Sequence, residues 1–126
     1  MSAAPALSRI GQIAVNVHDL DRAVAFYRDV LGLRFLFQAP RLAFFDCGGI
    51  RLMLAPPEKP EYDHPGSILY YQVEDIRAVH AALAAKGMGF EDAPHVVAPL
   101  GPKDLWMTFG HDSEGNLLAL MSEVPR

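Results

Sequence analysis

Two of the five histidines lie where an imidazole could take part in acid–base chemistry. His95 follows Pro94 in an extended segment, and His111 precedes Asp112 at the end of an apolar run. An imidazole beside a carboxylate is a usable acid–base pair. If the two segments pair as strands, His95 and His111 can approach one another or Asp104, and these three side chains could also hold a metal ion. The alternative, which we favour, is that His111 belongs to a turn and that His95 bonds to backbone.

The remaining candidates for chemistry give weaker signals. His18 lies where a strand meets a helix and His80 lies on a helix, so we expect both to be solvated or capping, while His64 falls in a proline-rich linker. Cys47 is the only cysteine, and its only basic neighbour is Arg51. We expect a buried, inert thiol and, because no internal disulfide can form, a reducing compartment.

Local patterns in the first half predict the elements that position these residues. Residues 10–17, IGQIAVNV, alternate in hydrophobicity and predict a strand. Residues 20–31 carry apolar side chains at helical spacing, with Asp19 as a cap and Gly32 as a stop, and predict a helix. Three further strands are expected at 34–39, 41–47 and 50–55.

The second half repeats this order after a proline-rich linker at 56–66. YQVEDIRAVHAALAAKG follows the pattern of VNVHDLDRAVAFYRDVLG at an offset of about 55–60 residues. One such unit buries too little apolar surface to fold alone, so two must combine. The second half is expected to contain a strand at 67–73, a helix at 74–87 and extended segments at 89–98, 105–110 and 116–124.

These motifs resemble the vicinal oxygen chelate superfamily, which includes glyoxalase I, bleomycin-resistance proteins, extradiol dioxygenases and methylmalonyl-CoA epimerase. IAVNVHDLDRAVAFYRDVLGL is similar to the family's opening strand and helix, YYQVEDIRAVHAALAAKG to its second copy, and FGHDSEGNLLALM to its closing turn and strand. The resemblance implies an α+β fold in which two βαβββ modules form a half-barrel cup with the helices outside, and it implies frequent homodimers. It says little about the reaction, because one scaffold hosts many activities.

We therefore expect one domain over residues 1–126 and two modules within it. Module one spans about 8–55, the linker 56–66, and module two about 67–124. The apolar strand edges, together with the resemblance, favour a homodimer.

The resemblance also points to four positions that hold a divalent metal in metal-using members. In this sequence they fall on Gln12, Leu52, Ile68 and Ala119. Only Gln12 offers an oxygen donor, and a divalent ion needs several oxygen or imidazole ligands. We therefore expect no metal cofactor, and a divalent metal at a non-standard site is the alternative.

Strand alternation predicts which side chains share the cup with Gln12. In 105–110 the inward set is either Trp106 and Thr108 or Leu105, Met107 and Phe109. An apolar lining with a few polar donors is typical of a small-molecule pocket, and simple packing is the alternative for each residue. The candidate ligand-binding residues are Gln12, Asn16, Tyr70, Gln72, Trp106 and Phe109.

Composition and charge narrow the function classes. The 126 residues are 51% hydrophobic and 21% charged, which is typical of a globular domain. The net charge of −4 and the scattered basic residues argue against nucleic-acid or anionic-membrane partners. No apolar run approaches the roughly 18–20 residues of a membrane span, and MSAAPALSR lacks a secretory pattern. We expect a cytoplasmic protein.

Two function classes follow. The first is metal-independent binding of a small organic molecule in the cup, as the resemblance to the bleomycin-resistance branch implies. The second is a lyase, isomerase or dioxygenase-type enzyme that uses a non-standard metal site or a pair formed by His95 and His111. The sequence does not decide whether the chain catalyses a reaction.

Overall fold

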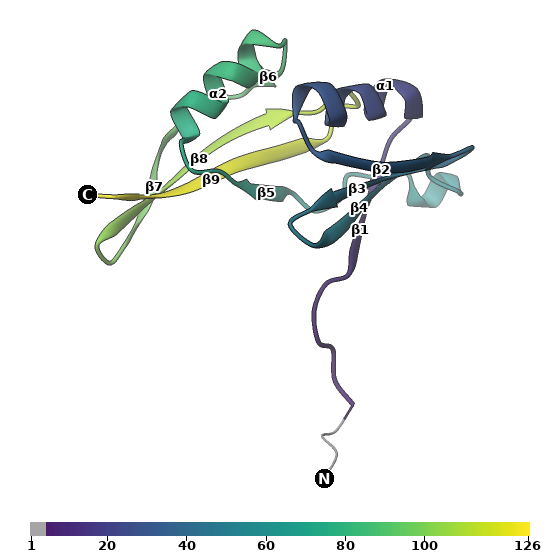
Figure 1. Ribbon diagram of the computed structural model, residues 1–126, viewed down its shortest axis with the longest axis horizontal. Helices are drawn as coiled ribbons and strands as arrows, with labels where there is room; N and C mark the ends of the chain where they lie inside the picture. Colours follow the sequence, from purple (N-terminus) through teal and green to yellow (C-terminus); the bar gives the residue numbers. More distant parts are fainter. Residues whose placement is uncertain (1–4) are drawn as a thin grey trace.

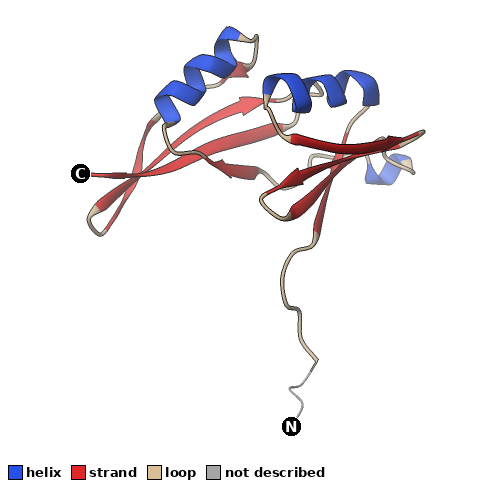
Figure 2. Cartoon of the chain, in the orientation of Figure 1, coloured by secondary structure: helices blue, strands red, loops and turns tan. Residues whose placement is uncertain are grey.

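The computed structural model describes residues 5–126, which form two β-sheets with one helical segment over each (Figure 1). Both helices lie on the same side of the molecule, and the two sheets lie beneath them (Figure 2). The predicted α+β class with two similar modules is confirmed. Within the described residues, no helix is long and apolar enough to cross a membrane.

Module one is a four-stranded sheet covered by one helix. Its elements are β1 (Gln12–Asn16), α1 (Leu20–Ala25), the π-helical turn η1 (Phe26–Val30), β2 (Arg34–Ala39), β3 (Leu42–Cys47) and β4 (Ile50–Ala55). The strand order is β1-β4-β3-β2. β1 pairs with β4 in parallel, whereas β2, β3 and β4 follow one another as antiparallel hairpins. The β3–β4 turn is made by Gly48 and Gly49, both at positive φ, as a two-residue hairpin loop requires.

Module two repeats this plan with one additional short strand. Its elements are β5 (Leu69–Gln72), α2 (Ile76–Ala85), β6 (Gly89–Phe90), β7 (His95–Leu100), β8 (Lys103–His111) and β9 (Leu117–Pro125). The strand order is β5-β9-β8-β6, and β7 also pairs with β8. The segment predicted as one strand at 89–98 is therefore divided in two. The linker contains a single 3-10 turn, η2 (Pro60–Tyr62).

The two helices begin in the same way, which confirms the repeat. The side chain of Asp19 accepts from the N–H of Arg22, and the side chain of Asp75 accepts from the N–H of Ala78, each at 3.1 Å. The first helix widens in its second half, where the N–H of Leu31 donates to the carbonyl of Phe26, five residues back.

Each helix packs on one face of its sheet. The first core joins Tyr27 of the helical segment to Phe45, Leu52 and Leu54 of the sheet, and all four are almost fully buried. The second core consists of Ile76, Leu83, Met88, Leu118 and Leu120. The opposite face of each sheet points away from its helix and is called the open face below.

The burial of Leu52 corrects one sequence-based assignment. Leu52 was placed on the cup side, but its side chain is 2% exposed and belongs to the core beneath α1. Its neighbours Arg51 and Met53 lie on the open face instead, because side chains alternate along a strand. The position that the resemblance assigns to Leu52 is therefore shifted by one residue on this strand.

Candidate functional site

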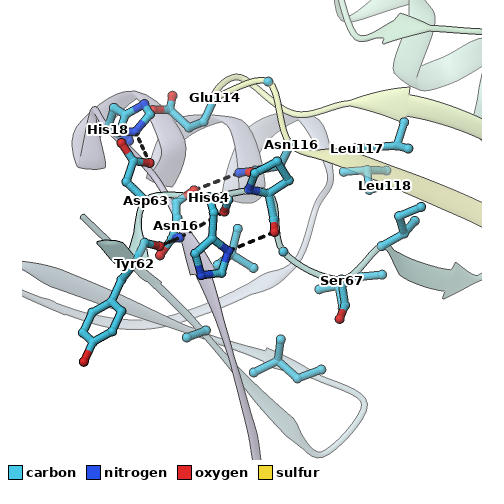
Figure 3. Close-up of a pocket in the computed structure, with 18 of the residues that line it drawn as sticks. Asn16, His18, Tyr62, Asp63, His64, Ser67, Glu114, Asn116, Leu117 and Leu118 are labelled. Atoms are coloured by element: carbon cyan, nitrogen blue, oxygen red, sulfur yellow. Dashed lines mark hydrogen bonds and ion pairs between the residues drawn. The ribbon is translucent and has the colours of Figure 1, made fainter. Parts of the chain in front are cut away.

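A cavity of about 880 Å³ lies between the two modules. It is bordered by β1 of module one, β5 and β9 of module two, the linker and the β8–β9 turn (Figure 3). Its apolar walls are Ile13, Ala14, Val15, Ile68, Leu69, Leu117 and Leu118. Its polar and aromatic side chains are Asn16, His18, Tyr27, Tyr62, Asp63, His64, Ser67, Tyr71, Glu114 and Asn116.

The linker forms one wall because it is bonded to the end of β1. The side-chain amide of Asn16 donates to the carbonyl of Tyr62 at 2.6 Å and to that of His64 at 3.5 Å. The Nε2 atom of His18 lies 2.8 Å from Oδ1 of Asp63 (Figure 3). A proline-rich segment is thereby held in one place over the cavity.

The β8–β9 turn forms a further border next to the linker, and its carboxylates are buried (Figure 3). Asp112 is 6% exposed and accepts from the backbone N–H groups of Glu114 (2.8 Å) and Asn116 (2.9 Å) and from the hydroxyl of Tyr27 (2.6 Å). The amide of Asn116 donates to the carbonyl of Asn16 at 2.9 Å. The turn of module two is thus bonded to both the helix and the first strand of module one.

Glu114 extends this connection to the start of α1. Its carboxylate accepts from the N–H groups of His18 (2.9 Å) and Asp19 (2.8 Å) and from Nε of Arg22 (2.7 Å). Burial acts to raise the pKa of Glu114, but the hydrogen bonds from Arg22, Asp19 and His18 outweigh it and lower the pKa to about 2. A carboxylate at a helix N-terminus is also stabilised by the helix dipole. We call Asp112, Glu114 and Asn116 the module clamp.

Two tyrosines of the lining have contrasting hydroxyl groups. Burial raises the pKa of Tyr27, and the nearby Asp112 carboxylate raises it further. The hydroxyl of Tyr71 is buried without a hydrogen-bond partner among residues 5–126, and burial raises its pKa, with a further contribution from the Cys47 thiol. The Cys47 thiol itself has a pKa raised by burial and by Asp46, which is the environment of an inert thiol.

Most of the predicted ligand-binding residues lie on the open faces rather than in this cavity. Asn16 is the predicted residue that lines it. On module one, Oε1 of Gln12 accepts from Nε of Arg51 at 2.8 Å, and the Arg51 guanidinium lies 4.7 Å from the centre of the Phe44 ring. The cavity forms where strand edges and loops meet, so strand alternation identified the sheet faces but not the cavity.

On module two, the open face carries an aromatic pair. Tyr70 and Phe109 are both paired with Ala119, and their rings meet edge to face with centroids 5.9 Å apart. Gln72 lies opposite Met121 on the same face. Ala119 is fully buried between its neighbours.

The placement of Trp106 corrects its assignment to the cup. Its ring packs on the core beneath α2, and the guanidinium of Arg77 lies 4.8 Å from the ring centroid. Of the two inward sets considered for β8, the structure has Leu105, Met107 and Phe109 on the open face. The indole instead makes a cation–π contact at the outer side of the sheet.

The structure does not bring His95 and His111 together. His95 is opposite Met107 in the β7–β8 pairing, four residues from His111, a separation of about 13 Å along a strand. The Nδ1 atom of His95 bonds to the carbonyl of Ala93 at 2.9 Å.

His111 and Asp104 each have a partner other than His95. His111 lies 3.4 Å from Glu91, and Asp104 forms an ion pair with Arg126 at 2.9 Å. The acid–base pair and the shifted metal site are therefore not assembled, and the alternative of backbone bonding for His95 describes the structure.

The four positions that the resemblance associates with a divalent metal do not fit one. Ile68 and Ala119 offer hydrocarbon only, and Leu52 is buried beneath α1, so that β4 presents Arg51 and Met53 on the open face instead. The single oxygen donor, Oε1 of Gln12, accepts from the guanidinium of Arg51, so a cation there would meet a positive charge. Within residues 5–126, no group of three or more His, Cys, Asp or Glu side chains is placed to hold a metal ion.

The comparisons with known proteins agree that this chain is similar to glyoxalase-like proteins. A family described as "Glyoxalase/Bleomycin resistance protein/Dioxygenase superfamily" matches residues 9–120. A "Glyoxylase-like domain-containing protein" of Didymella fabae is 29% identical over 123 residues, covering 89% of this chain and 91% of that protein.

Solved structures show the same fold. A lactoylglutathione lyase from Agrobacterium tumefaciens superposes with a TM-score of 0.71 at 25% identity, covering 92% of this chain and 94% of the other. A member of the glyoxalase/bleomycin resistance protein/dioxygenase superfamily from Sphaerobacter thermophilus gives a TM-score of 0.76 at 22% identity, with coverage of 93% and 98%.

Proposed function

The chain belongs to the glyoxalase/bleomycin resistance protein/dioxygenase superfamily, and from that premise we propose that it binds a small organic molecule between its two modules without the divalent metal of metal-using members. The observation that carries this proposal is the cavity itself, whose volume of about 880 Å³ falls within the range of small-molecule sites. Seven aliphatic side chains form its walls, and a few polar groups stand at its border.

The borders of the cavity are pre-organised, which favours ligand binding. The linker is bonded to Asn16 and His18 at the end of β1, and the module clamp bonds the neighbouring β8–β9 turn to the same two residues. The residues at these borders should therefore rearrange little when a ligand binds.

Absence of a metal is part of the proposal. Its support is the chemistry of these positions: Ile68 and Ala119 are hydrocarbon, Leu52 is buried in the core, and the Gln12 amide oxygen accepts from Arg51. The geometry does not support the alternative of an enzyme in which His95 and His111 form an acid–base pair, because each imidazole has a different partner. We propose no reaction.

We also propose that two copies of the chain associate through their open faces. Phe37 of the edge strand β2 pairs with Phe44 on the open face of module one, Tyr70 lies on the open face of module two, and both are more than a third exposed. Exposed apolar clusters of this kind mark association surfaces. Sedimentation velocity tests the association: we expect a dimer that Phe37→Asp converts to monomer, and a wild-type monomer at high concentration would contradict it.

Filling the cavity tests the binding proposal. Ala14 is exposed within β1 and lines the cavity, so Ala14→Trp should occupy ligand space without disturbing the core. Ala82, exposed on α2 and outside the cavity lining, provides the control Ala82→Trp. We expect a saturable ligand found by thermal-shift screening to lose at least about tenfold in affinity, or about 1.4 kcal/mol, for Ala14→Trp only. Equal affinity in both variants would contradict the proposed site.

A further inference from the structure

The lining of the cavity contains carboxylates but no lysine or arginine among the described residues. The two carboxylates are Asp63 in the linker and Glu114 in the module clamp, and the two imidazoles are His18 and His64. An anionic ligand needs a positively charged partner when it leaves water, because an uncompensated charge is costly to bury. The lining therefore disfavours a ligand that carries a negative charge.

The charge of Glu114 is already compensated within the protein. It accepts from the guanidinium of Arg22 and from two N–H groups at the start of α1. Its side chain is only 1% exposed, and the Arg22 guanidinium is held beside it. Glu114 is therefore unavailable to a ligand, and the Arg22 side chain, which is 56% exposed, does not line the cavity.

Asp63 is different, because it is only partly used. Its Oδ1 atom meets His18, whereas among the described residues its Oδ2 atom makes no hydrogen bond. Its side chain is 45% exposed at the border of the cavity. Lys59 lies near the lining without being part of it, and its ammonium is 5.7 Å from the centre of the Tyr62 ring.

Asn16 adds a second acceptor near Asp63. Its amide nitrogen is directed to the carbonyls of Tyr62 and His64, so its Oδ1 atom is left without a donor among residues 5–126. Figure 3 shows Asn16, Asp63 and His64 gathered at the same end of the site. This end therefore presents oxygen acceptors, while the apolar walls lie beyond it.

We propose that the ligand is an apolar molecule carrying one protonated amine, with the ammonium at the Asp63 end and the apolar body against the strand walls. The inference rests on the proposed binding function and specifies its ligand class. Carboxylate- or phosphate-bearing molecules are disfavoured, because they would meet Asp63 and acceptor oxygens in a lining that contains no lysine or arginine. A glutathione thioester, which carries carboxylates, should not bind.

A matched series of probes tests the charge preference directly. 2-Naphthylmethylamine, 2-naphthalenemethanol and 2-naphthoate share one apolar body and differ in charge. Isothermal titration at about pH 8, above the usual pKa of an imidazole, keeps the histidine contribution small. We expect the amine to bind at least about tenfold more tightly than the alcohol, and the carboxylate at least about tenfold more weakly.

Two variants assign the preference to Asp63. Asp63→Asn keeps an acceptor for His18 but removes the charge, so the amine should fall to within about threefold of the alcohol while the alcohol is unchanged. Glu58→Gln removes an exposed charge of the same linker that does not line the cavity and should change neither.

The outcomes separate this inference from the function on which it rests. Equal binding of the three probes, or an amine preference that survives Asp63→Asn, would overturn the charge assignment and leave a binding cavity. No saturable binding of any probe would overturn the binding function as well.

Discussion

The two modules contain equivalent turns with different roles. The turn between β3 and β4 begins at Asp46, and the turn between β8 and β9 begins at Asp112. Each aspartate accepts N–H groups of its own turn, from Gly49 in module one and from Glu114 and Asn116 in module two. In both turns an aspartate carboxylate therefore stabilises the backbone N–H groups that follow it. The module-two turn in addition holds α1 and β1 of module one, which creates one border of the cavity.

This difference shows how a repeat acquires an asymmetric site. The Gly-Gly loop of module one joins Cys47 to Ile50, whereas the longer loop 112–116 joins His111 to Leu117 and brings one additional carboxylate and one amide. Those two side chains meet backbone groups that a helix start and a strand end leave unsatisfied. In the module-one turn, Gly48 and Gly49 have no side chain that could reach module two.

The largest effect should come from removing Asp112, with its counterpart Asp46 in module one as the comparison. Asp112→Ala leaves the Tyr27 hydroxyl and buried N–H groups without acceptors and should cost about 3–5 kcal/mol in the free energy of unfolding. Asp46→Ala removes one local hydrogen bond and should cost about 1 kcal/mol or less. Urea denaturation measures both, and equal costs would show that the turns are equivalent.

Removing the charge of Glu114 should have the next largest effect. Glu114→Gln retains the size of the side chain but weakens its bonds to Arg22 and the start of α1, at a cost of about 2 kcal/mol near neutral pH.

The cost of Glu114→Gln should also depend on pH. The pKa of Glu114 is about 2 in the folded protein and 4.5 as an unperturbed group. A lowered folded pKa means that the stabilisation is complete above 4.5 and is lost as the pH falls towards 2. The difference in unfolding free energy between wild type and Glu114→Gln should therefore shrink over that range, and a difference independent of pH would contradict the role of this charge.

The two lining tyrosines should respond in opposite directions. Tyr27→Phe removes a donor from the buried Asp112 carboxylate and should destabilise by about 1–3 kcal/mol. Tyr71→Phe removes a buried hydroxyl that has no partner in the described chain and should be neutral or stabilising by about 1 kcal/mol. Thermal unfolding of both variants checks this, and a large loss for Tyr71→Phe would reveal a partner of its hydroxyl.

The elements and the fold could be predicted from the sequence because their signals are local. β2 and β4 begin and end as expected, and α1 starts at its predicted cap, Asp19. The repeat then supplied the module plan and the family resemblance.

The site was less predictable because it depends on contacts distant in sequence. Asn16, a predicted cup residue, lines the cavity between the modules, but the partners of Glu114 lie more than 90 residues away, at His18, Asp19 and Arg22. An acid and an asparagine in a turn are a signal for the turn alone. For Trp106, alternation allowed two orientations, and the contact with Arg77 on a separate helix decides between them.

Titration of EDTA-dialysed protein with 2-naphthylmethylamine, with metal content measured on the same sample, tests the central claim most directly. We predict a nearly metal-free protein that binds one amine per chain, and we expect Ala14→Trp to bind the amine at least about tenfold more weakly. A firmly held stoichiometric transition metal, or binding that appears only after metal is restored, would contradict it.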